Sequence, residues 1–136
     1  MTSISCACKE LLEREFKSKL DLNCQIELAH GMLDILSANE PAILVGVIEM
    51  DIDMARDMFR FREAGINLLK WKESVDRGVS PAKAQSRSGQ ALRVETCVVS
   101  PLPFHQLSKS VIVLLRTLGV HVVSTAGETA LATANR

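Results

Sequence analysis

The chain of 136 residues contains no tyrosine, and aromatic residues make up only 4% of it. This scarcity disfavours nucleic-acid binding by base stacking, which depends on aromatic side chains. No apolar run approaches the roughly 18 residues that a membrane-spanning helix needs, so we expect no membrane span. The first ten residues lack a basic segment followed by an apolar stretch, and we therefore expect no secretory signal.

Cysteine is also scarce, with four residues at irregular spacing. Because 47% of the chain is hydrophobic, an apolar core can form without disulfides, and we expect a cytoplasmic protein with reduced thiols. Cys6 and Cys8 have no second pair of ligands at zinc spacing, and Cys8 is expected to be buried. Cys97 and His105 could form a nucleophile pair, but no orienting group or oxyanion hole is evident.

The common catalytic and cofactor-binding motifs are missing as well. The sequence contains no glycine-rich dinucleotide or phosphate loop, no GxSxG and no HExxH. These absences, and the lack of an orienting group for Cys97 and His105, predict a protein that is not an enzyme and that carries no cofactor and no metal.

The net charge is zero, but the two halves of the chain differ in sign. Residues 1–63 hold seven Lys or Arg against twelve Asp or Glu, and residues 64–136 hold nine against four. Such asymmetry favours charged partners or self-association, unless the two halves interleave in the fold and their charges mix.

The apolar periodicity divides the chain into alternating elements. Helical spacing predicts helices at residues 5–19, 24–41, 51–65 and 101–119. Continuous apolar runs predict buried strands at residues 42–50, 66–71, 92–100 and 120–124. The polar, glycine- and proline-containing segment 72–90 is expected to be a long loop, and residues 125–136 a C-terminal tail.

This order of elements predicts one α/β domain spanning residues 1–136. We expect a three-layer α/β/α sandwich with a mostly parallel four-stranded sheet, because two helices precede the first strand and need a sheet face to cover. The alternative is a ferredoxin-like α+β fold, since residues 42–124 also follow the order βαββαβ after two N-terminal helices.

Four acidic residues follow the strand predicted at residues 42–50: Glu49, Asp51, Asp53 and Asp57. A calcium loop is excluded, because the positions for its glycine and its last glutamate hold Arg56 and Arg62. Two or three of these carboxylates could bind Mg²⁺ at the carboxyl end of the sheet. The simpler interpretation is that Asp51 or Asp53 caps the next helix and that Asp57 lies near its positive end.

A basic segment follows in the second half of the chain, formed by Lys70, Lys72, Arg77, Lys83, Arg87 and Arg93. Such residues could contact phosphates, with an exposed Trp71 stacking on a base. However, Trp71 ends an apolar run and is expected to pack inward, which leaves a solvated loop as the alternative.

Several segments together resemble the growth-arrest and DNA-damage-inducible stress proteins, small α/β/α relatives of the kink-turn-binding ribosomal proteins. They are "KELL" in the first helix, "ELAHGMLDIL", "AILVGVIEMDID", "INLLKW" and "ETCVVSP". The resemblance implies a dimeric protein of the nucleus and cytoplasm without enzymatic activity. It also implies that an acidic loop, here Glu49, Asp51, Asp53 and Asp57, docks partner proteins.

Three functional hypotheses follow from the sequence. The first is an interaction or regulatory domain that docks protein partners, or forms a homo-oligomer, through the acidic rim formed by Glu49, Asp51, Asp53 and Asp57. The second is a nucleic-acid-binding domain that uses the basic residues between Lys70 and Arg93. The third is a ferredoxin-like domain that senses a small metabolite between subunits.

Overall fold

The computed structural model describes residues 4–29, 31–39, 42–78 and 92–126. Its elements, in chain order, are α1 (Cys6–Phe16), β1 (Asp21–Leu28), β2 (Gly31–Asn39), β3 (Ala42–Glu49), α2 (Ile52–Arg56), α3 (Met58–Asp76), β4 (Arg93–Ser100), the 3₁₀ helix η2 (Phe104–Gln106), α4 (Lys109–Thr117) and β5 (Val120–Ser124). None of the described helices is long and apolar enough to cross a membrane.

The strands form one mixed sheet in the sequential order β1-β2-β3-β4-β5. Strand β2 is antiparallel to both of its neighbours, β1 and β3, whereas β3, β4 and β5 run parallel to one another. The predicted mostly parallel four-stranded sheet is therefore wrong. The ferredoxin-like alternative is wrong too, because its hairpin would join strands at residues 66–71 and 92–100, whereas residues 66–71 belong to α3, which crosses over and places β4 beside β3 in parallel.

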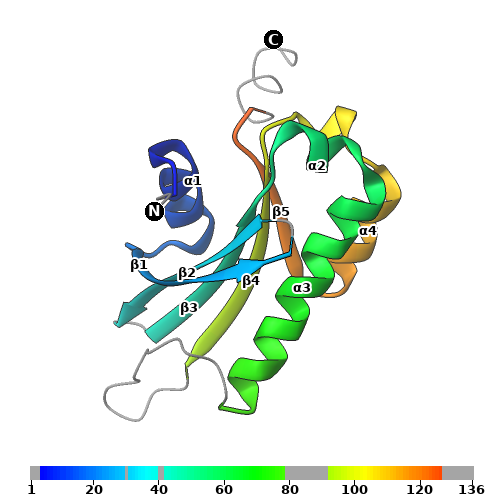
Figure 1. The fold of residues 1–136 in the computed structure, drawn as a ribbon. Coiled ribbons are helices and arrows are strands. Elements are labelled where there is room, and N and C mark those ends of the chain that lie inside the picture. The colour runs from blue at the N-terminus through cyan, green and yellow to red at the C-terminus, as the bar shows by residue number, and fades with distance from the viewer. Residues whose placement is uncertain (1–3, 30, 40–41, 79–91, 127–136) are drawn as a thin grey trace.

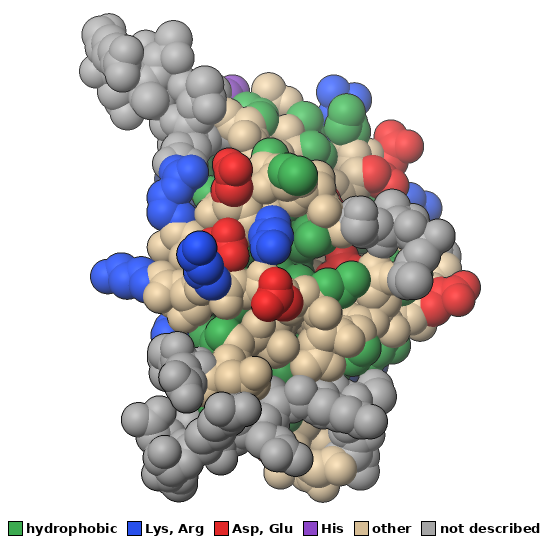
Figure 2. All heavy atoms as spheres, turned by 90° about the vertical axis from the view of Figure 1, so that its left-hand side faces the viewer, with side chains coloured by type: hydrophobic (Ala, Val, Ile, Leu, Met, Phe, Trp, Pro, Cys, Tyr) green, Lys and Arg blue, Asp and Glu red, His purple; other side chains and the backbone are tan. Residues whose placement is uncertain are grey.

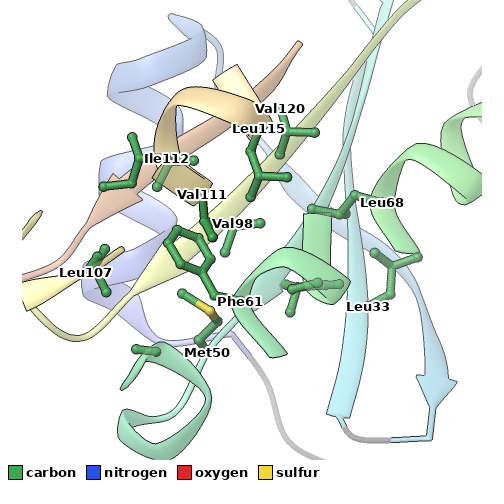
Figure 3. Close-up of a cluster of buried hydrophobic side chains, with 14 of the residues drawn as sticks. Leu33, Met50, Phe61, Leu68, Val98, Leu107, Val111, Ile112, Leu115 and Val120 are labelled. Atoms are coloured by element: carbon green, nitrogen blue, oxygen red, sulfur yellow. The ribbon is translucent and has the colours of Figure 1, made fainter. Parts of the chain in front are cut away.

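Helices cover both faces of this sheet (Figure 1). Helix α1 packs on one face, where its buried residues join β3, β4 and β5 in one apolar cluster. Helices α3 and α4 lie side by side on the other face and form a second, larger cluster with the sheet. Phe61 of α3 lies within this second cluster among Met50, Val98 and Val111 (Figure 3).

Where the sequence predicts a helix at residues 24–41, the described residues form strands β1 and β2, which pair in an antiparallel hairpin. The residues that were expected to face inward recur at helical spacing, namely Ile26, Ala29, Met32, Leu33 and Leu36. This pattern is ambiguous over so short a segment. Gly31 adopts φ 144° at the turn between the strands. Strand β2 also pairs with β3 along its other edge, and this pairing stabilises the extended conformation of β2. No local sequence signal predicts that pairing.

The strand predicted at residues 66–71 is also wrong, because helix α3 continues without interruption through Gly65 to Asp76. Gly65 was expected to end this helix. Instead it lets α4 approach, because a Cβ atom there would collide with the side chain of Leu115. The predicted loop 72–90 therefore begins as helix, and its residues 79–90 lie outside the described residues.

The remaining predicted elements are confirmed with adjusted ends. Helix α1 buries Cys8, Leu12 and Phe16 on one stripe, and β3 is buried along its length up to Ile48. Helix α4 begins at Lys109 after the cap of Ser108, because residues 101–108 form a turn and η2 instead. Most of the predicted tail, residues 127–136, lies outside the described residues.

Candidate functional site

Two residues of the predicted acidic rim are helix caps. Asp51 Oδ1 accepts a hydrogen bond from the Met54 amide at 2.8 Å and begins α2. Asp57 Oδ1 accepts from the amides of Phe59 and Arg60 at 2.9 and 3.3 Å and begins α3. The predicted capping role of Asp51 is therefore confirmed. These bonds fix the turn between β3 and α3, and they leave both carboxylates exposed at the surface.

The other two acidic residues lie on either side of this turn. Glu49 ends β3, and its Oε2 accepts a hydrogen bond from the Ser5 hydroxyl at 3.1 Å. The Asp53 side chain is exposed and makes no hydrogen bond or ion pair with the described residues. Within the described part of the chain, no three His, Cys, Asp or Glu side chains gather in a way that could hold a metal ion. The rim thus offers one carboxylate, that of Asp53, without an internal partner.

Large apolar side chains stand exposed beside these acids. Ile52, Met58 and Phe59 are 49%, 48% and 62% exposed. The guanidinium of Arg62 lies over the Phe59 ring, 5.5 Å from its centroid. We call the three apolar residues, together with Asp51, Asp53 and Asp57, the α2–α3 surface.

Sequence reasoning missed this apolar group. The helical spacing of Met54, Met58 and Phe61 favoured a shared apolar face, whereas only Phe61 of these three is buried. Phe59 and Phe61 are two positions apart, which puts them on nearly opposite sides of a helix. With one face of the helix on the sheet, one of the two rings is expected to be exposed. The spacing of Phe59 and Phe61 is therefore a sequence signal that could have predicted this exposed aromatic residue.

The predicted basic residues do not form one surface. Lys70 is exposed on α3, Lys72 is half-buried, and Arg77 pairs with Glu73 of the same helix. Arg93 instead lies on the α1 side of the sheet, bonded to Glu95 at 2.6 Å and lying over the Phe16 ring. Lys83 and Arg87 fall outside the described residues.

Trp71 cannot serve as a stacking platform for bases in this structure. Its side chain is only 5% exposed and packs against the sheet at Gly46. The expected inward packing of Trp71 is therefore confirmed.

The opposite net charges of the two halves of the sequence do not produce an acidic or a basic face on the side that carries α1. Acidic and basic side chains are interspersed there (Figure 2).

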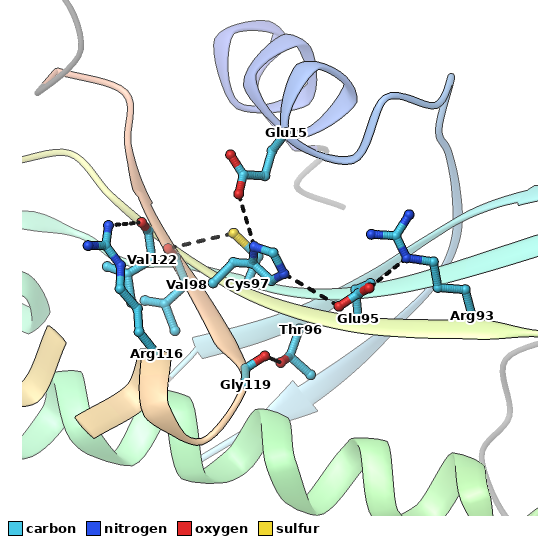
Figure 4. Close-up of polar contacts among 10 residues, drawn as sticks. Glu15, Arg93, Glu95, Thr96, Cys97, Val98, Arg116, Gly119 and Val122 are labelled. Carbon is cyan, nitrogen blue, oxygen red and sulfur yellow. Dashed lines mark hydrogen bonds and ion pairs between the residues drawn. The ribbon is translucent and has the colours of Figure 1, made fainter. Parts of the chain in front are cut away.

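A polar network joins α1 to the sheet at β4 and β5 (Figure 4). His121 Nδ1 lies 2.9 Å from Glu15 Oε2, and His121 Nε2 lies 3.4 Å from Glu95 Oε1. The histidine ring also meets the Phe16 ring edge-on, with the centroids 4.7 Å apart. No local sequence signal indicates this network, because Glu15 and His121 are 106 positions apart.

The buried thiols are poor candidates for nucleophiles. Desolvation in the core, together with the nearby carboxylates of Glu49 and Asp34, raises the pKa of Cys8 to about 12. Desolvation also raises the pKa of Cys97 well above its ordinary value. Cys97 is fully buried beneath α1, whereas His105 is exposed on η2. The predicted burial of Cys8 is confirmed, and a Cys97 thiolate would form only at strongly alkaline pH.

No protein-family model matches the chain, and no curated protein or solved structure matches it either. The resemblance to the growth-arrest stress proteins therefore stays a prediction. Two of the segments that carry it have a different secondary structure from the one expected. Within residues 27–36 the described residues belong to β1, β2 and the turn between them, and residues 66–71 belong to α3.

Proposed function

We propose that this protein is a non-enzymatic interaction domain that docks a partner protein through the α2–α3 surface. The observation that carries the proposal is the exposure of Ile52, Met58 and Phe59 at one turn of the chain. Exposed apolar side chains that gather and are rimmed by polar groups are typical of protein-binding sites. Phe59 is the anchor of this surface, because aromatic side chains contribute the largest share of binding energy at interfaces.

The charged residues around this anchor supply a rim. Asp51 and Asp57 are held in place by the helix amides that they cap. Asp57 Oδ2 also pairs with Arg60 at 3.9 Å, whereas the outer oxygen of Asp51 can meet a partner without further ordering. Asp53 has no internal partner among the described residues and can pair fully with a basic group. Arg62 is aligned over the Phe59 ring and restrains it. Preordered side chains lower the entropic cost of association.

The test is photo-crosslinking of the full chain in the cells that produce it. A benzophenone side chain replaces Ile52 at the edge of the surface, and the same group replaces Leu22, exposed on β1, as the control position. We expect an adduct of defined mass from position 52. The substitution Phe59→Ala should reduce its yield by about tenfold, as is typical when a central aromatic anchor is removed.

A matched pair of charge variants separates the rim from a general charge effect. Asp53→Asn removes a carboxylate from the α2–α3 surface, whereas Asp21→Asn removes one from the start of β1. Only the first should weaken the position-52 adduct, by a few-fold as for an exposed ion pair. An adduct that persists in Phe59→Ala, with an unchanged circular dichroism spectrum, would contradict the proposed docking surface.

A further inference from the structure

Strand β5 ends the sheet and borders an open groove. The groove has a volume of about 730 Å³ and runs between α1, which contributes Leu11, Arg14 and Glu15, and a second wall formed by Phe104 and Arg116. Strand β5 forms its floor. At the opposite end of the sheet, the register of β1 is interrupted by a bulge at Asn23, a feature that hinders further strand pairing.

Two hydrogen bonds show which backbone groups of β5 face the groove. The Thr125 amide donates to the Ser100 carbonyl of β4 at 3.0 Å, so the amides at odd positions point toward β4. Arg116 Nη2 donates to the Val122 carbonyl at 3.1 Å from the other side (Figure 4). The N–H and C=O groups of successive residues in a strand point to opposite edges. Those of Val120, Val122 and Ser124 therefore face outward.

This outer edge has hydrogen-bonding capacity left over. The Val122 amide has no acceptor within the described residues, and its carbonyl is met only by Arg116. The Val120, Val122 and Val123 side chains are buried, so the edge presents backbone rather than side chains. An added strand is the ligand that satisfies such a row of peptide groups.

The groove walls favour an acidic occupant. The Arg116 guanidinium is held 5.3 Å from the Phe104 centroid, and it has five N–H donors, of which the bond to Val122 uses one. Arg14 lies on the opposite wall. The acidic residue of the lining, Glu15, is already bonded to His121. The unused N–H donors of Arg116 therefore favour an anionic group in the ligand.

The same arginine disfavours a second copy of this chain as the occupant. Two β5 strands related by a twofold axis at Val122 would bring both Arg116 guanidinium groups close to that axis. Their repulsion opposes self-pairing, as charged side chains do at the edges of natural sheets. An incoming carboxylate has the opposite effect, because it can draw Arg116 away from the Val122 carbonyl and free that acceptor for the ladder.

We propose that the β5 edge binds an extended, acidic segment of another protein, which extends the sheet by one strand. The segment carries Asp or Glu at alternate positions, on the face that meets Arg116. This site is separate from the α2–α3 surface and does not depend on it.

The test begins with a random library of displayed peptides of about eight residues, slightly longer than a typical strand. Selection against the full chain should enrich Asp and Glu at every second position. Binding of the enriched peptides is then measured by fluorescence anisotropy. Arg116→Glu should weaken it by about tenfold or more, as expected for loss of a charge-assisted contact and gain of a repulsive one. Lys109→Glu, on the same helix but outside the groove, should change it little.

Backbone methylation of the peptide distinguishes strand addition from other modes of binding. N-methyl groups on the amides that face β5 should abolish binding, whereas N-methyl groups on the alternate amides should be tolerated. Hydrogen exchange should show new protection of the Val122 amide. Three results would overturn the proposal: no enrichment of acidic peptides, equal binding of both methylated series, or a β5-paired dimer of the free chain in sedimentation velocity.

Discussion

Helices α3 and α4 pack on one face of the sheet around two glycines, whereas α1 covers the other face alone. On the α3 side, Trp71 lies directly on Gly46 of β3, and Leu115 of α4 lies on Gly65 of α3. At both contacts, a large side chain thus packs against a glycine, which has no side chain. Such close packing leaves little room for adjustment, and its stability depends on shape.

The face under α1 is held in another way. Three residues of the helix, Cys8, Leu12 and Phe16, are buried against the strands. The ends of α1 are tied by polar groups, since Ser5 donates to Glu49 near its start and Glu15 contacts His121 near its end. A charged residue, Asp34 of β2, is buried in the sheet on this side.

The two faces should therefore fail under different changes. The α3 side should be sensitive to added volume, because its neighbours cannot give way. The α1 side should respond to the loss of polar partners and to pH, because part of its attachment consists of ionisable groups. Three predictions test this contrast.

The largest effect is expected for Gly46→Ala on the α3 side. A Cβ atom at residue 46 would lie 2.5 Å from the Trp71 ring, which is rigid and only 5% exposed. Overpacking of this kind costs about 1–3 kcal/mol, so the free energy of unfolding should fall by that amount in urea titrations. In a Trp71→Leu background the same change should cost much less. An equal cost in both backgrounds would contradict the contact.

The glycines also show where sequence reasoning reaches its limit. Helix α1, strand β3 and helix α4 could be predicted because periodicity, caps and apolar runs are local signals. Gly65 could not be interpreted locally, since a glycine can end a helix or admit a neighbouring one. Only the contact with Leu115, 50 positions later in the chain, decides between these roles.

The same limit applies to the candidate site, where local features can be predicted from the sequence and long-range contacts cannot. The cap of Asp51 follows from its position before an apolar turn, and the structure confirms it. The exposure of Phe59 depends on which side of α3 meets the sheet, which in turn depends on long-range packing. The partners of His121 come from α1 and β4, far away in the sequence, so no spacing rule could identify them.

A smaller effect is expected for His121→Ala on the α1 side. The change removes the contacts with Glu15 and Glu95 and the edge-on contact with the Phe16 ring. Because the histidine is partly exposed, the loss should be about 1 kcal/mol. Hydrogen exchange should speed up in α1 more than in α3. His105→Ala removes an exposed histidine on η2 and should change neither quantity. Equal acceleration of hydrogen exchange in α1 and α3 would contradict the proposed difference between the two faces of the sheet.

The smallest effect, and one of opposite sign, is expected for Asp34→Asn. Burial raises the pKa of the Asp34 carboxyl above its ordinary 3.8, and the hydrogen bond that Gln25 donates at 2.6 Å opposes this only in part. The folded state therefore holds this proton more tightly than the unfolded state does. Ionisation at neutral pH costs stability, and the wild-type protein regains it as the pH falls through the folded pKa toward the unfolded one.

Asparagine cannot ionise, and its oxygen can still accept from Gln25. At pH 7 the Asp34→Asn variant should consequently melt about 2–4 °C above the wild type, which corresponds to less than about 1 kcal/mol for a domain of this size. The difference should shrink as the pH is lowered and should be absent below about pH 3.8, where both side chains are neutral. Asp21→Asn, at an exposed position on β1, should show no such gain. A variant less stable than the wild type at pH 7 would mean that the Asp34 charge is compensated, and that the α1 side is held by ionised groups rather than strained by one.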